Sequence, residues 1–468
     1  MPSLAALRVY DTILDTIGNT PLVKLNRITQ SLQCTMYGKL EFFNPGGSVK
    51  DRIGLAMIED AERSGKLKPG GTVVESTSGN TGVGLAIACV IKGYKSIFVM
   101  PDKMSIEKIR LLRAFGAKVV ITPTAVEPND PRSYYSVANR IVAETPNAIL
   151  ANQYHNPINP EAHVRTTGPE IWEQTQGAVT DVVIGMGTGG TVTGVARFLK
   201  SKNPSIKIIA VDIVGSLLYD TWKLGHIPSE PFLKTYKIEG IGEDFLPSTL
   251  DLSLVDEVVQ VGDKESFLTA RRLVREEGIF CGGSSGSAVA GALRYARNLA
   301  ADRFVVVIIP DSGSRYLSKM FDDEWMREMG FLESAWSETR ASDILGSKAV
   351  QEIYTAKLQD RLIEVVARMK KYDISQLPVV GSEGKLIGMV SEVDLLNHLI
   401  TNDHKHDPSE TIENITRAEV ASVAPDMPLE SLMSIFVNGQ VAVVVSDNKP
   451  LGILTKIDLL DYLSSREK

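Results

Sequence analysis

The chain has 468 residues, 43% of them apolar and 23% charged, and its net charge of −7 argues against nucleic acid as the main partner. Its three cysteines lie far apart without a CxxC pair, which excludes a disulfide framework and a cysteine-based zinc site. No run approaches the ~18 consecutive apolar residues of a membrane helix, and the first residues lack a secretory leader, so we expect a cytoplasmic protein of two or three domains.

Short β-branched runs alternate with amphipathic segments as far as about residue 330. The runs have the continuous apolar character of buried parallel strands, and segments such as 106–116 between them have helical spacing. The strand-like runs cover residues 71–76, 95–101, 117–122, 181–187, 206–212 and 304–310. This alternation predicts an α/β fold with a doubly wound sheet, or two such sheets.

The stretch NPGGSVKDR, residues 44–52, places Lys50 on a turn that enters a helix. Helical spacing continues in apolar residues at Ile53, Met57, Ile58 and Ala61. A lysine at such a turn can be an active-site amine, although Asn, Gly and Ser also precede ordinary surface helices. The stretch alone leaves both interpretations open.

A second strand-to-helix junction, ESTSGNTGVGLAIA at residues 75–88, is rich in hydrogen-bonding side chains. They are Thr77, Ser78, Asn80 and Thr81. An ordinary N-cap would explain one Ser or Thr but not four such side chains in five positions. Because the first N–H groups of a helix are also free, we expect this loop to bind a carboxylate.

A glycine-rich loop follows the strand in VVIGMGTGGTVTG, residues 182–194. Gly185, Gly187 and Gly190 fit the pattern GxGxxG, and Asp212 closes the next strand, as a dinucleotide-binding fingerprint requires. A nicotinamide dehydrogenase that uses residues 185–190 is therefore an alternative. The broader prediction is a phosphate site, since glycines let backbone N–H groups approach an anion at a helix start.

A third junction, FCGGSSGSAVAGAL at residues 280–293, contains several serines. Ser284 could cap the helix, or its hydroxyl could meet a ring nitrogen if a pocket lies nearby. Cys281 has no evident histidine partner, so we interpret it as a core residue and not a nucleophile.

Together the four motifs describe a site for an aldehyde cofactor that carries a phosphate, and for an amino-acid substrate. Residues 1 to about 330 resemble the β-family of pyridoxal-phosphate enzymes through PGGSVKDR, TSGNTG, GTGGT and GGSSG in that order. The resemblance implies fold type II, with two three-layer αβα subdomains around open, twisted, mainly parallel sheets. It disfavours the dehydrogenase, which would explain only the glycine loop.

Within this group the chain is similar to the cystathionine β-synthase family over nearly its whole length. The shared motifs are EFFNPGGSVKDRI, NQYHNPINPEAH, TTGPEIW and EGIGEDFLP. The resemblance implies a β-replacement that condenses serine or O-acetylserine with homocysteine to cystathionine, with hydrogen sulfide released when cysteine is the donor. A cysteine synthase that transfers sulfide to O-acetylserine is the alternative within the class.

The resemblance also implies roles for single residues. Lys50 would bind pyridoxal phosphate covalently and move the α-proton of the substrate, Asn80 would contact the ring oxygen, and Ser284 the ring nitrogen. The phosphate would lie against Gly187, Thr188, Gly189, Gly190 and Thr191. The substrate carboxylate would lie against Thr77, Ser78, Thr81 and Gln153.

Two departures from the family pattern change what we expect. The chain starts only shortly before the region of resemblance, where animal enzymes have a heme-binding extension, so we expect no heme. Glu243 stands where the animal and yeast enzymes have tyrosine in GIGYDF, near the entrance for the second substrate. We expect a homodimer or a higher homo-oligomer and no metal.

The sequence pattern changes after residue 331: a polar stretch follows, and the remaining sequence contains two similar units. Helical patterns at Leu362 to Met369 and Leu429 to Phe436 each precede a β-rich stretch. These repeats resemble a tandem pair of CBS domains. We predict a catalytic domain at 1–331, a linker at 332–343, and CBS domains at 344–402 and 412–468.

The two repeats end their last strands with a Ser/Thr-x-x-Asp motif. Thr455 with Asp458, and less clearly Ser391 with Asp394, could offer a hydroxyl and a carboxylate to the ribose of S-adenosylmethionine, AMP or ATP. The same residues also serve as ordinary helix caps, which leaves ligand binding open. We interpret the histidines of NDHKHDP, residues 402–408, as part of a polar linker because further metal ligands are lacking.

Overall fold

The structure is a computed structural model of the chain, and it describes residues 9–77, 79–102, 106–123, 126, 130–332, 339–348, 352–401, 407 and 409–465. The chain divides into two units, Met1–Phe331 and Leu332–Lys468. Within the described ranges, no helix has the length and apolar character needed to span a membrane.

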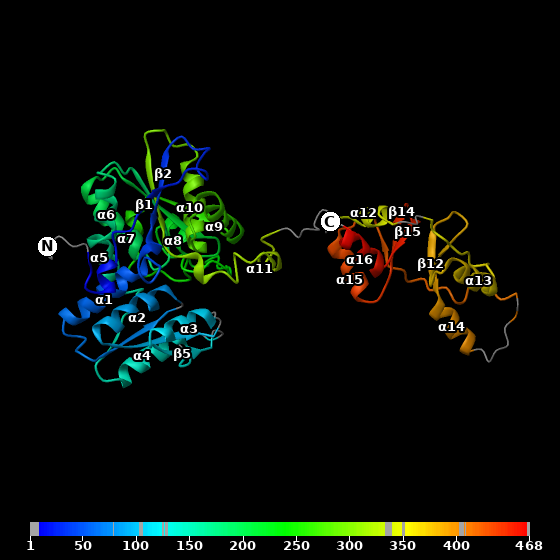
Figure 1. Cartoon of the computed structure of the whole chain (residues 1–468), viewed down its shortest axis with the longest axis horizontal. Coiled ribbons are helices and arrows are strands. Elements are labelled where there is room, and N and C mark those ends of the chain that lie inside the picture. The colour runs from blue at the N-terminus through cyan, green and yellow to red at the C-terminus, as the bar shows by residue number, and fades with distance from the viewer. Residues whose placement is uncertain are drawn as a thin grey trace. The chain divides into compact units, whose positions relative to one another are not determined.

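A four-stranded parallel sheet forms the smaller lobe of the first unit, blue to cyan in Figure 1. Its order is β5-β4-β3-β6, with β3 Thr72–Ser76, β4 Lys95–Pro101, β5 Lys118–Thr122 and β6 Ala148–Leu150. Helices surround it as α1 Lys50–Arg63, α2 Asn80–Lys92, α3 Ile106–Ala114 and α4 Tyr134–Glu144. The strands predicted at 71–76, 95–101 and 117–122 are thereby confirmed.

Both faces of this sheet are covered, which explains why its strands are apolar at every position. Val73 on β3 and Phe98 on β4 pack with α1, α2 and α3 in one core. Val74 and Val99, their neighbours in sequence, point to the opposite face and pack against α4. Successive side chains of a strand alternate between faces, so two covered faces require a continuous apolar run.

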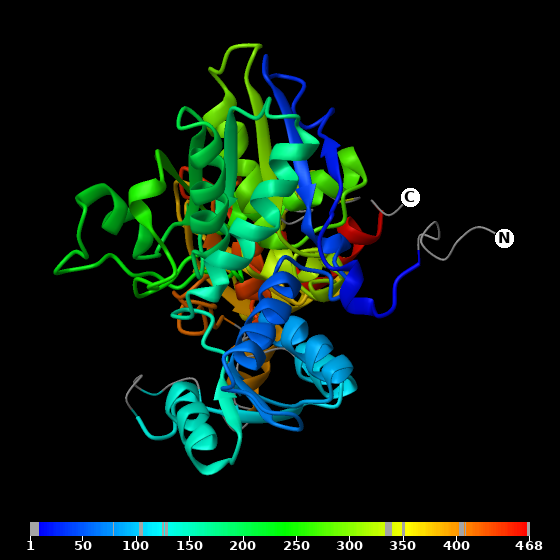
Figure 2. The same cartoon turned by 90° about the vertical axis from the view of Figure 1, so that its left-hand side faces the viewer.

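A six-stranded sheet of order β1-β2-β10-β7-β8-β9 forms the larger lobe, in which only β1 is antiparallel. Its strands are β1 Leu22–Lys24, β2 Thr35–Leu40, β7 Asp181–Gly185, β8 Lys207–Ile213, β9 Glu257–Val261 and β10 Phe304–Ile309. Its helices are α5 Ile158–Arg165, α6 Thr167–Gln174, α7 Gly190–Lys202, α8 Leu218–Leu224, α9 Asp263–Glu277 and α10 Gly283–Ala296, followed by α11 Asp323–Glu328. The turned view in Figure 2 separates the two lobes again.

The predicted fold class is confirmed, but four strands were not predicted. β1 and β6 have three residues each, and β2 and β9 mix polar with apolar residues. Their sequences therefore lack the uninterrupted β-branched run on which the prediction depended. Pairing with neighbouring strands stabilises such a strand even where its own sequence does not predict it. β2, for example, lies between β1 and β10.

A buried cluster of charges fixes the start of α1 against the larger lobe. Arg52 donates to both carboxylate oxygens of Glu41 at 2.7 and 2.8 Å, and to both of Glu170 on α6 at 2.6 and 2.8 Å. Lys39 on β2 donates to Glu170 at 2.6 Å. Burial alone would raise the pKa of Glu170, but Arg52 and Lys39 outweigh it and lower that pKa to about 2. This network sets the position of Lys50, two residues before Arg52.

The second unit contains the repeated sequence as two small sheets with helices. The first repeat has α13 Leu362–Tyr372, β11 Gln376–Val380, β12 Leu386–Ser391 and α14 Glu392–Thr401. The second has β13 Ser422–Val423, α15 Leu429–Val437, β14 Ala442–Ser446, β15 Lys449–Leu454 and α16 Lys456–Ser465. A further helix, α12 Ala341–Gly346, precedes both repeats.

The cores of the two repeats exchange their leading segments. Ala341 and Ile344 of α12 lie in the core of the second repeat, beside Leu432. Ile412 and Ile415, which precede the second repeat in sequence, lie in the core of the first. Each core thus contains residues from the other part of the sequence, as is typical of repeats that cannot bury a core alone.

Candidate active site

The lysine turn is built by short-range contacts at the junction of the lobes. The N–H of Val49 donates to the carbonyl of Pro310 at 2.8 Å, so the turn is anchored to the end of β10. The carboxylate of Asp51 accepts the N–H of Gly46 at 2.5 Å and occupies the space where a Cβ of Gly46 would lie. This glycine therefore makes room for the protein's own carboxylate and not for a ligand.

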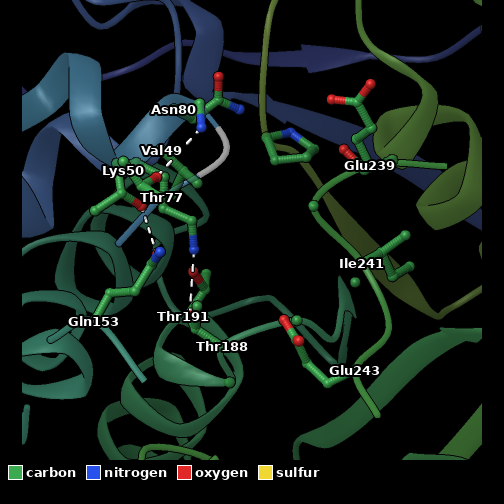
Figure 3. A pocket seen from close by; sticks show the side chains of 18 of the residues that line it. Val49, Lys50, Thr77, Asn80, Gln153, Thr188, Thr191, Glu239, Ile241 and Glu243 are labelled. Carbon is green, nitrogen blue, oxygen red and sulfur yellow. Dashed lines mark hydrogen bonds between the residues drawn. The ribbon is translucent and has the colours of Figure 1, made fainter. Parts of the chain in front are cut away.

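Lys50 is the first residue of α1, and its side chain points into a pocket between the lobes (Figure 3). Its Nζ donates to Oγ1 of Thr188 at 3.3 Å. The walls enclose about 950 Å³, the open mouth included. The polar and glycine residues of the lining are Lys50, Thr77, Gly79, Asn80, Thr81, Lys108, Gln153, Tyr154, Gly185, Gly187, Thr188, Gly189, Thr191, Glu239, Gly240, Glu243, Ser284 and Tyr316.

Burial lowers the pKa of Lys50 to about 8, and Glu243 and Asp311 offset part of this effect. An amine must be neutral to act as a nucleophile or a base. With an ordinary lysine pKa only a small fraction would be neutral near pH 8, whereas in this pocket about half is. The site therefore gives Lys50 the reactivity that its position in the sequence suggested.

The glycine loop lies between β7 and α7 and faces Lys50. Gly189 precedes α7 with a φ of +83°, a backbone conformation that favours glycine. At Gly190, the first residue of the helix, a Cβ would overlap the side-chain oxygen of Asn159. The amide nitrogen of Asn159 donates to Oγ1 of Thr188 at 3.2 Å and to the carbonyl of Gln153 at 2.7 Å. The loop leaves the free N–H groups of a helix start at the pocket wall, where an anion can bind.

The second predicted loop meets the pocket from the smaller lobe. The Thr81 hydroxyl donates to the side-chain oxygen of Gln153 at 2.5 Å, and Thr77 also lines the pocket. Ser78 lies outside the described residues. The backbone around Gln153 is held by buried Glu75, whose carboxylate accepts the N–H groups of Asn152 at 2.5 Å and Gln153 at 3.3 Å.

Asn80 begins α2 and has protein partners on both ends of its amide. Its nitrogen donates to Asp311 at 2.9 Å, and its oxygen accepts from Arg315. Ser284 lies in the first turn of α10 and also lines the pocket. Cys281 is fully buried and burial raises its pKa, so the interpretation as a core residue is confirmed.

Several residues that line the pocket or hold its lining residues were not found from the sequence. Asn159 and His163 come from α5, and Nε2 of His163 lies 3.2 Å from the Thr191 hydroxyl. Burial, with Arg52 and Lys50 nearby, lowers the pKa of His163, so its ring is neutral. The sequence contained one indication of Asn159 and His163, because both are polar residues of a single helix within NPINPEAH. Nothing in the sequence indicated Lys108 and Glu239, which also line the pocket, because isolated charged residues are common on protein surfaces.

The residue that the dehydrogenase alternative needs does not reach the pocket. Asp212 is fully buried, and its carboxylate accepts the N–H of Tyr219 at 2.9 Å at the start of α8. A ribose-binding carboxylate would have to face the glycine loop. Within the described ranges, no three His, Cys, Asp or Glu side chains gather as a metal site requires, and His404 and His406 lie outside them.

Comparison with known proteins agrees with this geometry. The family model described as pyridoxal-phosphate dependent enzyme matches residues 13–311, and the CBS domain model matches 341–401 and 412–465. A cystathionine β-synthase of Dictyostelium discoideum is 40% identical, over 98% of this chain and 93% of that protein. The Saccharomyces cerevisiae cystathionine β-synthase is 36% identical, over 97% of both chains.

Two solved structures match about two thirds of the chain. A hydrogen sulfide-producing enzyme from Fusobacterium nucleatum is 38% identical with a TM-score of 0.61, covering 66% of this chain and all of that one. O-ureido-L-serine synthase is 36% identical with a TM-score of 0.62, covering 68% of this chain and 99% of that one. The chain therefore belongs to the family of pyridoxal-phosphate-dependent enzymes, fold type II, and within it to the cystathionine β-synthases.

Proposed function

We propose that this chain is a pyridoxal-phosphate-dependent β-replacement enzyme that condenses serine or O-acetylserine with homocysteine to give cystathionine. The observation that carries the proposal is a single pocket lined by a lysine of lowered pKa, the start of a helix suited to phosphate, and a loop suited to a carboxylate. The names of the relatives support the same reaction.

The pocket residues fit the cofactor by their chemistry. Lys50 offers an amine for the aldehyde, and Gly187, Thr188, Gly189, Gly190 and Thr191 offer backbone N–H groups and hydroxyls for the phosphate. The close contact between Gly190 and Asn159 supports this assignment, because it keeps the backbone of the loop at the pocket wall. When bound, the cofactor withdraws electrons from the α-carbon of the amino acid, which makes the α-proton removable.

Ser284 would face the ring nitrogen of the cofactor, and Asn80 its ring oxygen. A neutral hydroxyl at the nitrogen leaves that atom without the charge that a carboxylate would induce, which favours loss of a β-substituent over transamination. Asn80 can take this role only if its amide exchanges Arg315 or Asp311 for the cofactor, since both bond to it in the structure.

The chain's own residues then divide the work on the first substrate. Thr77, Ser78, Thr81 and Gln153 would hold its carboxylate, which orients the α-proton toward the lysine. Lys50 would take this proton and later return one to the same carbon. Its Nζ lies beside the Thr188 hydroxyl at 3.3 Å, so the amine stays directed into the pocket when it carries no substrate.

Assays with three donors and two acceptors test the function. We expect serine or O-acetylserine to react with homocysteine, and threonine to react poorly. A preference for O-acetylserine with sulfide over every reaction with homocysteine would instead identify a cysteine synthase. We also propose that cysteine, as donor, releases hydrogen sulfide, and the printed title of the Fusobacterium neighbour supports this.

Uptake of pyridoxal phosphate by the cofactor-free protein should depend on the pKa of Lys50. A pKa of about 8 means that the neutral amine is scarce at pH 7 and dominant at pH 9. The rate at which visible absorbance develops should therefore rise about tenfold from pH 7 to pH 9 and then level off. An ordinary lysine would contradict this, with a rise of about 100-fold over the same range and no plateau.

The CBS pair offers a second candidate site, for an adenosine-type ligand. Thr455 lines a cavity within the second unit, of about 800 Å³ with its open mouth included, together with Lys348 and Tyr354. The Thr455 hydroxyl donates to Asp458 at 2.6 Å, and Nζ of Lys348 lies 2.8 Å from the other carboxylate oxygen. We propose that Thr455 and Asp458 bind the ribose of S-adenosylmethionine, AMP or ATP, and that Lys348, which pairs with Asp458 in the structure, also contacts an anionic group of the ligand.

The equivalent pair in the first repeat provides the matched control. The Ser391 hydroxyl donates to Asp394 at 2.6 Å, and Arg417 pairs with the same carboxylate. Calorimetric titration should detect one of the three ligands in the wild type, at least about tenfold weaker binding in Asp458→Asn, and little change in Asp394→Asn. Absence of binding of all three ligands to the wild type would remove the proposal.

We further propose a cytoplasmic homodimer, or a higher homo-oligomer, that works without heme. The similarity to cystathionine β-synthases along the whole chain supports an enzyme of this general type. Light scattering coupled to gel filtration would give the oligomer, and the absence of a Soret band in purified holoenzyme would agree with a heme-free protein.

A further inference from the structure

One charged side chain in the pocket has no task in the roles given above. Glu243 lines the pocket, and Figure 3 shows its carboxylate pointing into the cavity from the side opposite Lys50 and Thr188. Neither the phosphate loop nor the carboxylate loop needs a negative charge there. A carboxylate would in fact repel both the phosphate and the carboxylate of the first substrate if either lay against it.

The backbone holds Glu243 firmly at this place. Its N–H donates to the Ser216 hydroxyl at 3.1 Å, and its carbonyl accepts the N–H of Leu217 at 2.8 Å. The preceding N–H, of Gly242, donates to the carbonyl of Met186 at 2.6 Å, beside the glycine loop. The main chain at Glu243 is thus held in place where its side chain lines the pocket.

The carboxylate of Glu243 also lacks a close cation. Among the residues that the structure describes, no Lys, Arg or His nitrogen forms an ion pair with it. Burial and the charge of Asp244 raise the pKa of Glu243 to about 8, against a smaller opposing effect of Tyr154 and Lys50. With this pKa the carboxyl is largely protonated near pH 7, and a ligand that brings a positive charge beside it favours the ionised form.

We propose that Glu243 binds the α-ammonium group of the acceptor and so selects an amino-acid thiol over sulfide. This rests on the proposed β-replacement. An amino-acid acceptor carries an ammonium group a few bonds from its sulfur, so the sulfur can approach the reacting carbon near Lys50 while the ammonium meets Glu243. Hydrosulfide brings no cation that would favour ionisation of Glu243, and its negative charge is repelled by the ionised form of that carboxyl.

The neighbouring charges do not offer the same contact. Glu239 also lines the pocket, but it already bonds to Lys108 and accepts from Lys319 at 2.7 Å. Its negative charge is therefore balanced by two lysines. Of the two acidic residues in the pocket lining, Glu243 is therefore the one that can bind the ammonium group of an acceptor.

A comparison of two acceptors with two enzymes tests this role. Homocysteine and 4-mercaptobutyrate, which is the same thiol acid without the amino group, would be assayed with holoenzyme of the wild type and of Glu243→Gln. We expect the wild type to prefer homocysteine by about 10- to 100-fold in kcat/KM, mainly through KM, as one charge-assisted hydrogen bond allows. The preference should fall to about threefold or less in the variant, and sulfide should react as well or better.

Further variants separate this role from the other possibilities. Glu243→Asp keeps the charge and should retain part of the preference, whereas Asp244→Asn, at an exposed neighbour, should retain nearly all of it. An equal loss of kcat with both thiols would identify a proton-transfer role and overturn the inference, as would an unchanged preference in Glu243→Gln. If the wild type made no thioether from either serine or O-acetylserine with any thiol, the proposed function would fail first.

Discussion

Lys50→Ala should abolish cystathionine formation, with a loss of at least about 1,000-fold in kcat. The reason is that the variant loses both the amine that anchors the cofactor and the base that moves the α-proton. These tasks belong to one atom, Nζ, and the 3.3 Å contact with Thr188 fixes its place in the pocket. The rate with serine and homocysteine and the visible absorbance of the purified protein would both be measured.

A lysine outside the pocket supplies the control. Lys95 is an exposed residue at the start of β4, so Lys95→Ala should keep both the colour and the rate of the wild type. Far-ultraviolet circular dichroism of Lys50→Ala should match that of the wild type. A coloured, active Lys50→Ala protein would show that another amine carries the cofactor.

Gly190→Ala should weaken both the fold and cofactor binding. The added methyl group would overlap the side-chain oxygen of Asn159, whose amide nitrogen holds Thr188 and the backbone of Gln153. Overpacking of a rigid site costs about 1–3 kcal/mol in free energy of unfolding. Displacement of the loop should also lower the affinity for pyridoxal phosphate by at least about tenfold, since it misplaces several phosphate donors.

Urea unfolding and titration with pyridoxal phosphate would measure the two effects. Gly346→Ala is the matched control, because a Cβ at Gly346 meets no atom within 4 Å and its backbone does not need glycine. That variant should unfold and bind as the wild type does. Wild-type affinity in Gly190→Ala would contradict the assignment of the loop to the phosphate.

The sequence predicted the site best where the chemistry is local. Lys50, Asn80, Thr188 and Ser284 each lie in the first turn of a helix or just before it, a pattern that is visible in single stretches of sequence. All four line one pocket, where Asn80 and Thr188 follow the carboxyl ends of β3 and β7, whereas the helix of Ser284 comes directly after another helix, α9.

The remaining site residues could not be predicted because long-range packing defines their roles. Asn159 donates a hydrogen bond to Thr188, 29 positions away, and its side-chain oxygen occupies the space that a Cβ at Gly190 would need. Glu243 was noticed only as a departure from the family pattern. Its significance depends on which cations lie near it, and sequence spacing gives no such information. The charge cluster of Arg52 and Glu170 spans 118 positions and was not predicted for the same reason.

The second unit shows a similar limit. Repetition of sequence indicated two modules, and the structure contains two small cores. The exchange of leading segments between these cores was not visible, because Ile344 and Ile412 carry no sign of which core they join. The apolar character of a residue predicts that it is buried, but it does not predict which other residues it packs against.

The most direct test of the proposed reaction follows a label from donor to product. Holoenzyme would be incubated with serine labelled with carbon-13 at the β-carbon and with unlabelled homocysteine, and the products identified by mass spectrometry and NMR. We expect cystathionine that carries the label on the carbon bonded to sulfur. A parallel reaction would use O-acetylserine labelled at the same carbon. Unreacted label in both reactions, or label found only in pyruvate, would contradict the account.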